Sequence, residues 1–446
     1  MSDILFRLPE IYESAVNMYN SICEKSAEAE FVPVEEAGDG SGTVVRGDNL
    51  KYMRYLLDRG YEGKLDLIYI DPPFFSKSDY KINVKVGNKS KQLTLARTHA
   101  FSDRWADGMD EYLREMTVRL LMMRRLLSDT GSIFVHLDWH SSHYMKILLD
   151  QIFGRENFIN EIIWNYKSGG VSNRYYARKH DVILFYAKSD RYYFSPQKEK
   201  SYNRGLKPYR FKGVKEYCDE VGWYTLVNMK DVWQVDMVGR TSSERTGYAT
   251  QKPEAVIERI LASAVPEGGL CADFFCGSGT LGASCEKLGL RYILCDNGGP
   301  AVMTAHKRLV KKGTGHVLYN EVDKSGSAIG NDNFRPVVSV TPLEGVIETT
   351  SVSIDGVSYE SLEDLGIEEK NRDLMKTIIN NHYGQLIDYW CVDFDYDGKV
   401  IRPGTFAYSE KGDIDLAVVL PTKRIKRLAV RVVDVFGNEY TYERDD

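Results

Sequence analysis

Two apolar runs, far apart in the chain, each lead into a short motif of turn-forming residues. Residues 65–70 precede Asp71-Pro72-Pro73-Phe74, and residues 270–274 precede Phe275-Cys276-Gly277-Ser278-Gly279. Apolar runs of this length between helical patterns are typical of buried strands in a mostly parallel α/β sheet. Ligands of such sheets bind at the carboxyl ends of the strands. We therefore expect both motifs at one edge of one sheet, facing a shared crevice.

The bulk properties predict a globular protein of the cytoplasm. The chain has 446 residues, enough for two domains and a third small module, with 43% hydrophobic and 27% charged side chains. No basic stretch followed by an apolar one opens the chain, and no apolar run reaches the roughly 20 residues of a membrane helix. The seven cysteines include no CxxC pair, so we expect reduced thiols.

The net charge of −6 is unevenly distributed along the chain. Residues 351–446 hold 19 acidic and 12 basic side chains, so the remaining 350 residues carry a net +1. Within them, residues 191–215 hold eight Lys or Arg and one acid. The acidic balance therefore belongs to the C-terminal part and does not argue against a nucleic-acid partner.

The pattern of apolar residues divides the chain into five parts. We expect a helical N-terminal segment at 1–40 and an α/β domain in two halves, 41–190 and 250–320. Between the halves lies a region without regular alternation, 191–249, and a β-rich accessory module follows at 336–446. Residues 1–42 are predicted as a helix followed by a loop, residues 321–335 as linker, and 75–102 as a long loop beside the site. A loop of that length is commonly a lid or a substrate contact.

The first motif can activate an amino group on a base. Asp71 and the Pro72 carbonyl can each accept one amino hydrogen, which turns the nitrogen lone pair toward a methyl donor. The prolines stiffen the backbone that presents this carbonyl, and Phe74 offers a face for stacking a base. The alternative is a plain turn after a strand, because Asp and Pro are common turn residues.

The second motif allows a ligand to approach the backbone closely. Gly277 and Gly279 have no Cβ to obstruct it. Asp273 ends its strand where it could meet an ammonium group, and Asp296 ends the next strand, where an acid usually holds ribose hydroxyls. A plain strand-to-helix turn, and a plain turn at Asp296-Asn297-Gly298, are the alternatives.

The motifs and their order resemble the β class of amino DNA methyltransferases, including type III modification subunits, in which the acceptor motif precedes the cofactor motif. The resemblance covers about residues 44–310 and includes Thr250-Gln251-Lys252-Pro253. It implies a Rossmann-like, mostly parallel seven-stranded sheet with helices on both faces, a recognition insert and a small β-rich C-terminal module. The implied cofactor is S-adenosylmethionine, whose sulfonium is already activated, so no metal is implied.

The resemblance assigns roles to individual residues. Asp71, Pro72, Pro73 and Phe74 would be catalytic, with adenine N6 as the target, because cytosine-specific members usually carry Ser in place of Asp71. Tyr is more usual at position 74. The implied cofactor contacts are Asp48, Thr250, Gln251, Lys252, Asp273, Phe275, Cys276, Gly277, Ser278, Gly279 and Asp296. Asp48 would meet the cofactor's adenine and Lys252 its carboxylate, unless Lys252 is merely an exposed lysine at a helix start.

The stretch 191–215 interleaves basic and aromatic residues. Lys and Arg would meet phosphates, and aromatic rings could stack on bases or wedge between them. In the β class the target-recognition region lies between the two sheet halves, as this stretch does. The predicted DNA contacts are Arg191, Lys198, Lys200, Arg204, Lys207, Arg210 and Lys212; the alternative is a solvated basic surface.

His136, His140 and His143 invite a metal-site interpretation. However, His136 is predicted on a strand and the other two on the following loop and helix, so their convergence is not assured. We expect structural or DNA-facing histidines instead. His180, at the start of a strand, is also expected to be structural.

The hypothesis is a site-specific DNA methyltransferase that flips adenine out of duplex DNA. The alternatives are the same chemistry on cytosine N4 or on RNA, and a non-catalytic DNA-binding partner that retains the fold. Intact Asp71, Gly277 and Gly279 argue against the non-catalytic alternative. Double-stranded DNA, a second copy of the chain and a restriction subunit are the partners that the resemblance implies; no membrane association is expected.

Overall fold

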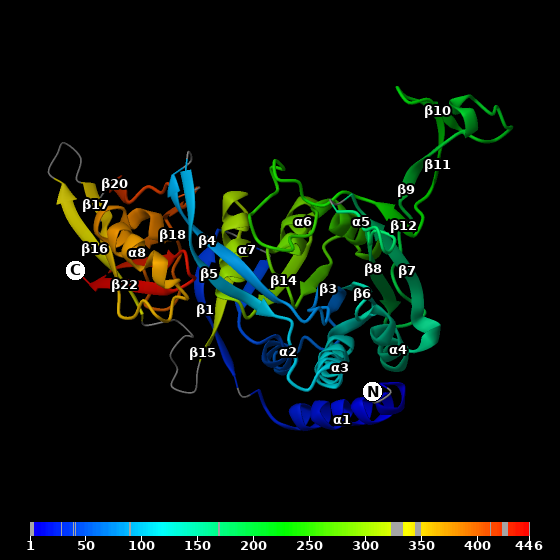
Figure 1. The fold of residues 1–446 in the computed structure, drawn as a ribbon, viewed down its shortest axis with the longest axis horizontal. Coiled ribbons are helices and arrows are strands. Elements are labelled where there is room, and N and C mark those ends of the chain that lie inside the picture. The colour runs from blue at the N-terminus through cyan, green and yellow to red at the C-terminus, as the bar shows by residue number, and fades with distance from the viewer. Residues whose placement is uncertain are drawn as a thin grey trace.

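A ten-stranded sheet forms the centre of the protein (Figure 1), in the order β1-β15-β2-β14-β13-β3-β6-β8-β7-β12. The computed structural model describes residues 4–27, 29–38, 40, 42–88, 91–167, 170–322, 333–343, 349–410, 412–421 and 427–445. The strands of this sheet are β1 (Glu30–Ala37), β2 (Gly42–Arg46), β3 (Leu65–Ile70), β6 (Leu127–Leu137), β7 (Phe158–Asn165), β8 (His180–Ala187), β12 (Val232–Gln234), β13 (Leu270–Asp273), β14 (Arg291–Asp296) and β15 (His316–Val322).

Most neighbouring strands of this sheet are parallel, as the sequence predicts. Six of the nine neighbouring pairs are parallel, and the exceptions are β1–β15, β6–β8 and β7–β8. The sheet is larger than the seven strands predicted, because β15 and β1 extend one edge and β12 extends the other. Successive residues of β3 alternate between two cores: Ile68 and Ile70 face one, while Leu67 and Tyr69 face the other. Because both faces of such a central strand are buried, its sequence is a nearly continuous apolar run.

Helices cover both faces of the sheet. The first core contains residues of α1 (Ile4–Glu24), α2 (Asn49–Asp58), α3 (Met109–Leu126) and α4 (Ser142–Phe153). The second core contains residues of α5 (Glu254–Ala264), α6 (Thr280–Leu288) and α7 (Gly299–Lys311). Leu113, Met116 and Leu120 recur along α3 at the spacing of one helix face, and all three are buried. Within the described residues no helix is long and apolar enough to cross a membrane.

Two segments predicted as loops form strands instead. Residues 30–37 are β1, which pairs antiparallel with β15, an edge strand that sequence spacing alone does not reveal. Residues 75–102 contain the antiparallel hairpin of β4 (Asp79–Asn88) and β5 (Lys91–Ser102). Val84 and Val86 of this hairpin are buried against the C-terminal module, so their alternation was the strand signal that the loop prediction missed.

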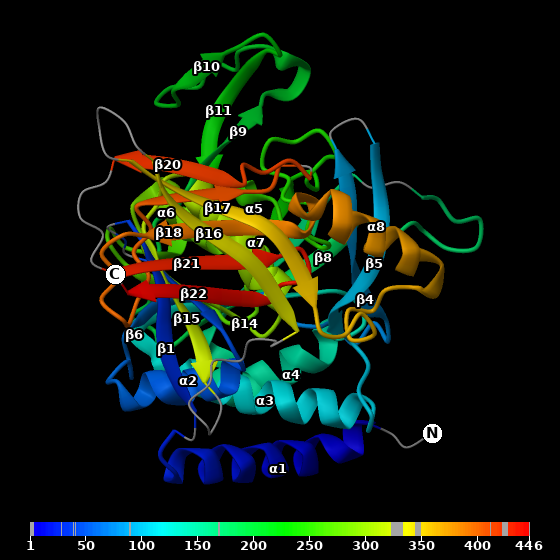
Figure 2. The ribbon, with the colours of Figure 1, turned by 90° about the vertical axis from the view of Figure 1, so that its left-hand side faces the viewer.

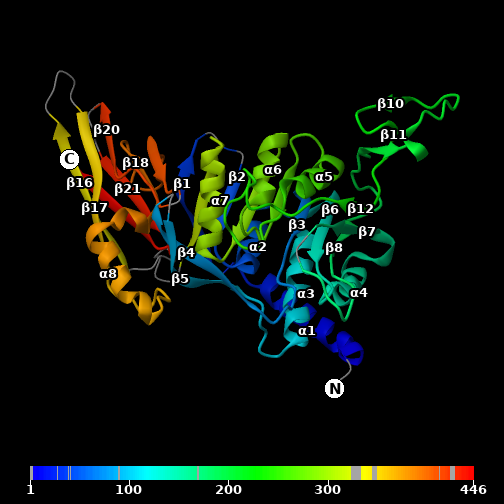
Figure 3. The ribbon, with the colours of Figure 1, turned by 45° about the horizontal axis from the view of Figure 1, so that its top comes forward.

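The region between the two sheet halves projects from the body. In Figures 1 and 3 a small sheet of β9 (Lys198–Tyr202), β10 (Glu216–Cys218) and β11 (Trp223–Asn228) stands away from the central sheet. Its strand order is β10-β11-β9, with antiparallel pairs. We call residues 198–228 the arm. The chain then returns through β12 to the edge of the central sheet.

The C-terminal module is β-rich, as predicted, and Figure 2 shows it facing the viewer. It contains one three-stranded sheet, one four-stranded sheet and α8 (Arg372–Asn381). Its strands are β16 (Phe334–Leu343), β17 (Thr349–Tyr359), β18 (Ile387–Asp393), β19 (Thr405–Tyr408), β20 (Ala417–Pro421), β21 (Arg427–Asp434) and β22 (Glu439–Asp445). Of the predicted linker 321–335, residues 323–332 lie outside the described residues, while Glu321 and Val322 belong to β15.

Candidate active site

A cavity of about 620 Å³ opens at the carboxyl ends of β3 and β13, which are parallel neighbours. Both sequence motifs line it, so the predicted shared crevice exists. The predicted residues that line it are Asp48, Asp71, Pro72, Pro73, Phe74, Thr250, Lys252, Asp273, Phe275, Cys276, Gly277, Ser278 and Asp296. Among the predicted cofactor contacts, Gln251 and Gly279 are absent from the lining.

Asp71 lies between two cationic groups. Its Oδ2 forms an ion pair with Lys252 Nζ, and its Oδ1 lies 3.0 Å from His136 Nδ1. Burial alone would raise the pKa of Asp71, but Lys252 and His136 outweigh burial and hold that pKa below its usual value. The ring of Phe74 lies edge-on to His136, with centroids 5.5 Å apart. Asp71 is therefore an ionised carboxylate beside an aromatic face.

The backbone that follows Phe74 is held in an unusual conformation. Phe75 and Lys77 have φ values of +64° and +57°, a region that L-residues seldom adopt. The buried carboxylate of Asp103 accepts hydrogen bonds from the backbone N–H groups of Phe75 at 2.9 Å and Ser76 at 2.5 Å. Asp103 comes directly after β5, so the end of the hairpin fixes the loop that follows the first motif.

The glycine motif is fixed mainly by backbone hydrogen bonds to carboxylates. Gly277 and Gly279 have φ values of +49° and +70°. Asp296 accepts from the N–H groups of Gly277 and Gly298, each at 2.9 Å. A Cβ on Gly277 would lie 3.4 Å from the ring of Tyr248. The absence of a side chain therefore leaves room between this turn and Tyr248.

Several acidic side chains line the cavity. Asp273 is 3% exposed and accepts from the N–H of Phe275 at 2.9 Å. Burial raises the pKa of Asp273 well above its usual value, and the nearby carboxylates Asp71 and Asp296 raise it further. Burial also raises the pKa of Asp296. A cationic ligand would relieve this repulsion, so the cavity suits a positively charged molecule.

Asp48 and Asn49 hold the start of α2 against the same cavity. Asp48 caps the helix by accepting from the N–H of Lys51 at 3.0 Å. The amide of Asn49 donates to the carbonyl of Phe274 at 2.8 Å, which ties α2 to the turn after β13. Asp48 therefore has a structural role in addition to its place in the lining.

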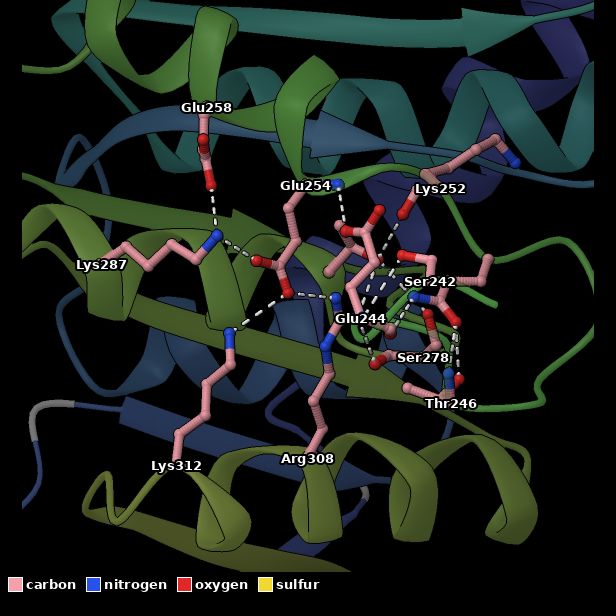
Figure 4. Close-up of polar contacts among 12 residues, drawn as sticks. Ser242, Glu244, Thr246, Lys252, Glu254, Glu258, Ser278, Lys287, Arg308 and Lys312 are labelled. Carbon is pink, nitrogen blue, oxygen red and sulfur yellow. Dashed lines mark hydrogen bonds and ion pairs between the residues drawn. The ribbon is translucent and has the colours of Figure 1, made fainter. Parts of the chain in front are cut away.

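The segment 250–254 is anchored by a buried charge network, shown in Figure 4. Glu254 is 5% exposed and pairs with Arg308 at 2.5 Å, with Lys312 at 3.2 Å and with Lys287. Burial alone would raise the pKa of Glu254, but these cations lower it to about 2. Arg308 also donates to the carbonyl of Ser278 at 3.2 Å. The network therefore links the start of α5 to the glycine motif.

Gln251 holds the preceding loop and does not face the cavity. Its side-chain oxygen accepts from the N–H and hydroxyl of Thr246, both at 2.8 Å, and its amide donates to the carbonyl of Glu244 at 2.7 Å. This loop carries Tyr248 to the glycine turn. Lys252, by contrast, reaches across the cavity to Asp71.

A family model described as DNA methylase matches residues 65–306, more than half of the chain. The chain belongs to the DNA methylase family. Type II methyltransferase M2.LlaDCHI of Lactococcus lactis subsp. cremoris is 27% identical over 282 residues, which cover 61% of this chain and 90% of that protein. Type II methyltransferase M.HpaI of Haemophilus parainfluenzae is 27% identical over 277 residues, which cover 62% of this chain and 77% of that protein. The crystal structure of the M1.HpyAVI–SAM complex aligns with 60% of this chain and 98% of that one, at 17% identity and a TM-score of 0.38.

The predicted DNA contacts of this methylase fall into two places. Lys198, Lys200, Arg204, Lys207, Arg210 and Lys212 belong to the arm. Arg191 lies apart from them, because it pairs with Asp129 at 2.9 Å, near the amino end of β6. The backbone N–H of Tyr193 bonds the carbonyl of Thr130 at the same amino edge. Arg191 is therefore at the edge of the sheet opposite the cavity.

Sequence reasoning missed a group of exposed side chains at the cavity edge of this methylase. We define the rim as Trp139 together with residues 170–179. Trp139 follows β6, and the guanidinium of Arg178 lies 3.8 Å from the centroid of its ring. Tyr176 is 100% exposed and Trp139 is 48% exposed. Residues 167–179 contain four basic and no acidic residues, which was a readable signal.

Proposed function

We propose that this chain transfers a methyl group from S-adenosylmethionine to N6 of adenine in duplex DNA. The observation that carries the proposal is that Asp71 and the glycine motif line one cavity. Family membership supports a DNA methylase, and the choice of adenine rests on Asp71 at the position where cytosine-specific relatives usually have Ser. A non-catalytic role would not require an ionised carboxylate in this position.

The cavity suits S-adenosylmethionine by charge and by shape. That molecule carries a net positive charge at neutral pH, and five aspartates line the cavity: Asp48, Asp71, Asp103, Asp273 and Asp296. Asp273 would hold the ammonium group and Asp296 the ribose hydroxyls, while Gly277 leaves space for the methionine portion. The backbone carbonyl of Lys252 accepts a hydrogen bond from the Thr280 hydroxyl at 3.2 Å, next to the glycine motif, and its ammonium would exchange Asp71 for the cofactor carboxylate. When bound, the cofactor supplies an activated methyl group.

The acceptor side then prepares the amino group. Asp71 Oδ2 and the Pro72 carbonyl each accept one hydrogen from N6, which directs the nitrogen lone pair toward the methyl carbon. The bound cofactor would supply the methyl group for the new N–C bond and keep the electron pair of the broken S–C bond on sulfur, and one amino proton would leave toward Asp71 or water. Phe74 stacks against the extruded base and offsets part of the few kcal/mol that extrusion costs. Lys252 must leave Asp71 before the base can bind.

The rim and the arm would hold the DNA strand. At the rim, Tyr176 and Trp139 offer exposed faces for stacking, and Arg174 and Arg178 offer charges for phosphates. The arm adds the basic side chains of residues 198–212 at a distance from the cavity. Because the curated relatives named above are type II methyltransferases, we place the activity in a restriction–modification system, with a restriction enzyme as its functional partner.

Transfer of a labelled methyl group to duplex DNA, followed by identification of the modified nucleoside, tests the proposal. We expect N6-methyladenine, and an RNA duplex of the same sequence should compete poorly. Recovery of N4-methylcytosine would overturn the base assignment. Cofactor binding by calorimetry without any transfer to mixed-sequence DNA would favour the non-catalytic alternative.

A further inference from the structure

One buried histidine of the acceptor corner contacts two carboxylates. His136 is 0% exposed on β6; its Nδ1 lies 3.0 Å from Asp71 Oδ1 and its Nε2 lies 3.2 Å from Asp181 Oδ2. Asp181 is on β8, the antiparallel neighbour of β6. The two strands thus align Asp71, His136 and Asp181 in one row that ends at the proposed reaction centre.

The charges of this row favour an imidazolium between two carboxylates. Burial alone would lower the pKa of His136, but Asp71 and Asp181 outweigh burial and the positive charge of Lys252, and they raise that pKa above its usual value. The hydroxyl of Tyr69 lies 3.4 Å from Nδ1, and the hydroxyl of Tyr166 donates to Asp181 Oδ1 at 3.1 Å. With Lys252 present, the two positive charges match the two negative ones.

The two oxygens of Asp71 are not equivalent. Oδ2 pairs with Lys252, a flexible side chain that could leave with the cofactor carboxylate. Oδ1 is buried and has no aligned hydrogen bond, so the charge of His136 is its main polar contact. His136 belongs to a central strand and cannot leave. The base amino group can therefore replace Lys252 at Oδ2 while Oδ1 stays held.

We propose that His136, oriented by Asp181, is a positioning residue that holds Asp71 through Oδ1 and presents Oδ2 to the adenine amino group. This inference rests on the proposed function, because it assigns a partner to the proposed amino acceptor. A purely structural histidine would also fill this place in the core. The two roles differ in one respect: only a positioning role makes the rate of methyl transfer follow the charge of His136.

The test compares His136→Asn and Asp181→Asn with His306→Asn. His306 is a matched control, because its Nε2 lies 3.2 Å from Glu35 Oε1, both side chains are fully buried, and neither lines the cavity. The readouts are kcat as a function of pH, the KM for duplex DNA, the dissociation constant of S-adenosylmethionine, and Tm.

We expect His136→Asn to lower kcat on the order of 100-fold and Asp181→Asn on the order of 10-fold, with the dissociation constant of the cofactor within about twofold. In the wild type kcat should fall as pH rises through the pKa of His136. Loss of the Asp181 charge lowers that pKa, so in Asp181→Asn this fall should occur at lower pH. His306→Asn should lower Tm without moving the pH profile.

An unchanged pH profile and kcat in Asp181→Asn would overturn the inference, as would losses in kcat that only follow losses in Tm. If His136→Asn fails to fold, Asp181→Asn alone decides the result, because Asp181 is partly exposed at the start of its strand. A wild-type protein that transfers no methyl group would refute the proposed function. An active wild type with unaffected variants would refute only this inference.

Discussion

The two corners of the cavity are built in different ways. At the cofactor corner, carboxylates bind backbone N–H groups: Asp273 binds Phe275 and Asp296 binds Gly298, each two residues away, and Asp296 also binds Gly277 at the end of the neighbouring strand. At the acceptor corner, Asp71 is held by side-chain charges from distant segments, those of His136 and Lys252. The first corner is rigid because backbone defines it, whereas the second can exchange one partner for a substrate.

This difference matches what each corner must do. A glycine turn that receives a cofactor needs a fixed shape, and backbone hydrogen bonds provide it without depending on side-chain rotamers. An amino acceptor must give up one cation and accept a neutral amino group during each cycle. Lys252 is a predicted cofactor contact and also pairs with Asp71, so this ion pair couples the two corners of the site.

The largest effect should come from Asp71→Asn. The amide has nearly the same shape, but it is neutral and presents only one acceptor oxygen, so we expect methyl transfer to fall on the order of 1,000-fold. The cofactor should still bind, because the backbone-built corner does not use Asp71. Labelled methyl transfer and calorimetry measure the two quantities. An equal loss of methyl transfer and of cofactor affinity would show that cofactor binding depends on Asp71.

Glu254→Gln should lower the stability of the protein by about 3 kcal/mol, because it removes the carboxylate that pairs with the buried guanidinium of Arg308 and with two partly exposed lysines. Glu254 pairs with Arg308, Lys312 and Lys287 beneath the cofactor corner. Its pKa is lowered from 4.5 to about 2, so the stabilisation is complete above pH 4.5 and is lost as pH falls toward 2. Denaturant unfolding at several pH values measures the difference between the two proteins. A difference that stays constant between pH 5 and pH 3 would contradict the assignment.

Gly279→Ala should weaken cofactor binding on the order of 10-fold or more. The position has φ +70°, and a Cβ would lie 2.7 Å from the Cβ of Ala305, so the turn must shift. Gly289→Ala is the matched control: Gly289 has φ +65° and no atom within 4 Å of an added Cβ. The control variant carries the backbone strain without the clash, so its cofactor affinity should remain near that of the wild type.

The same contrast explains what could be predicted from the sequence. Asp71 and Gly277 were located because each follows a recognisable buried strand, and neighbouring parallel strands end at one edge. His136 and Asp181 were not connected to Asp71, because the contacts of His136 depend on the pairing of β6 with β3 on one side and with β8 on the other. The hairpin β4–β5 and the edge strand β1 were missed for a related reason: their partners are the C-terminal module and β15. Local motifs encode the backbone-built corner, whereas tertiary pairing creates the surroundings of Asp71.

Tyr176→Ala should weaken methylation of fully paired DNA about 10-fold, which is the loss expected for one stacked base. The same substitution should reduce methylation of a duplex with a mismatch at the target adenine by a smaller factor, because an unpaired base costs less to extrude. Tyr193→Ala is the matched control, since the backbone of Tyr193 lies at the amino edge of the sheet. Equal losses for the two variants would remove the special role of the rim.

The smallest effects concern single charges of the arm, and their order is informative. Lys212→Ala should reduce the dependence of DNA affinity on salt by about 0.9 in the logarithmic slope, the value for one phosphate contact. Lys200 already pairs with Asp219 at 2.7 Å, so its removal should change the slope less. Arg191, at the amino edge beside Asp129, should not change it at all. Fluorescence anisotropy with one duplex between about 50 and 200 mM salt measures all three variants. If Arg191→Ala changes the slope as much as Lys212→Ala, the DNA must contact the amino edge of the sheet as well as the arm, and Arg191 would have to be counted among the DNA contacts.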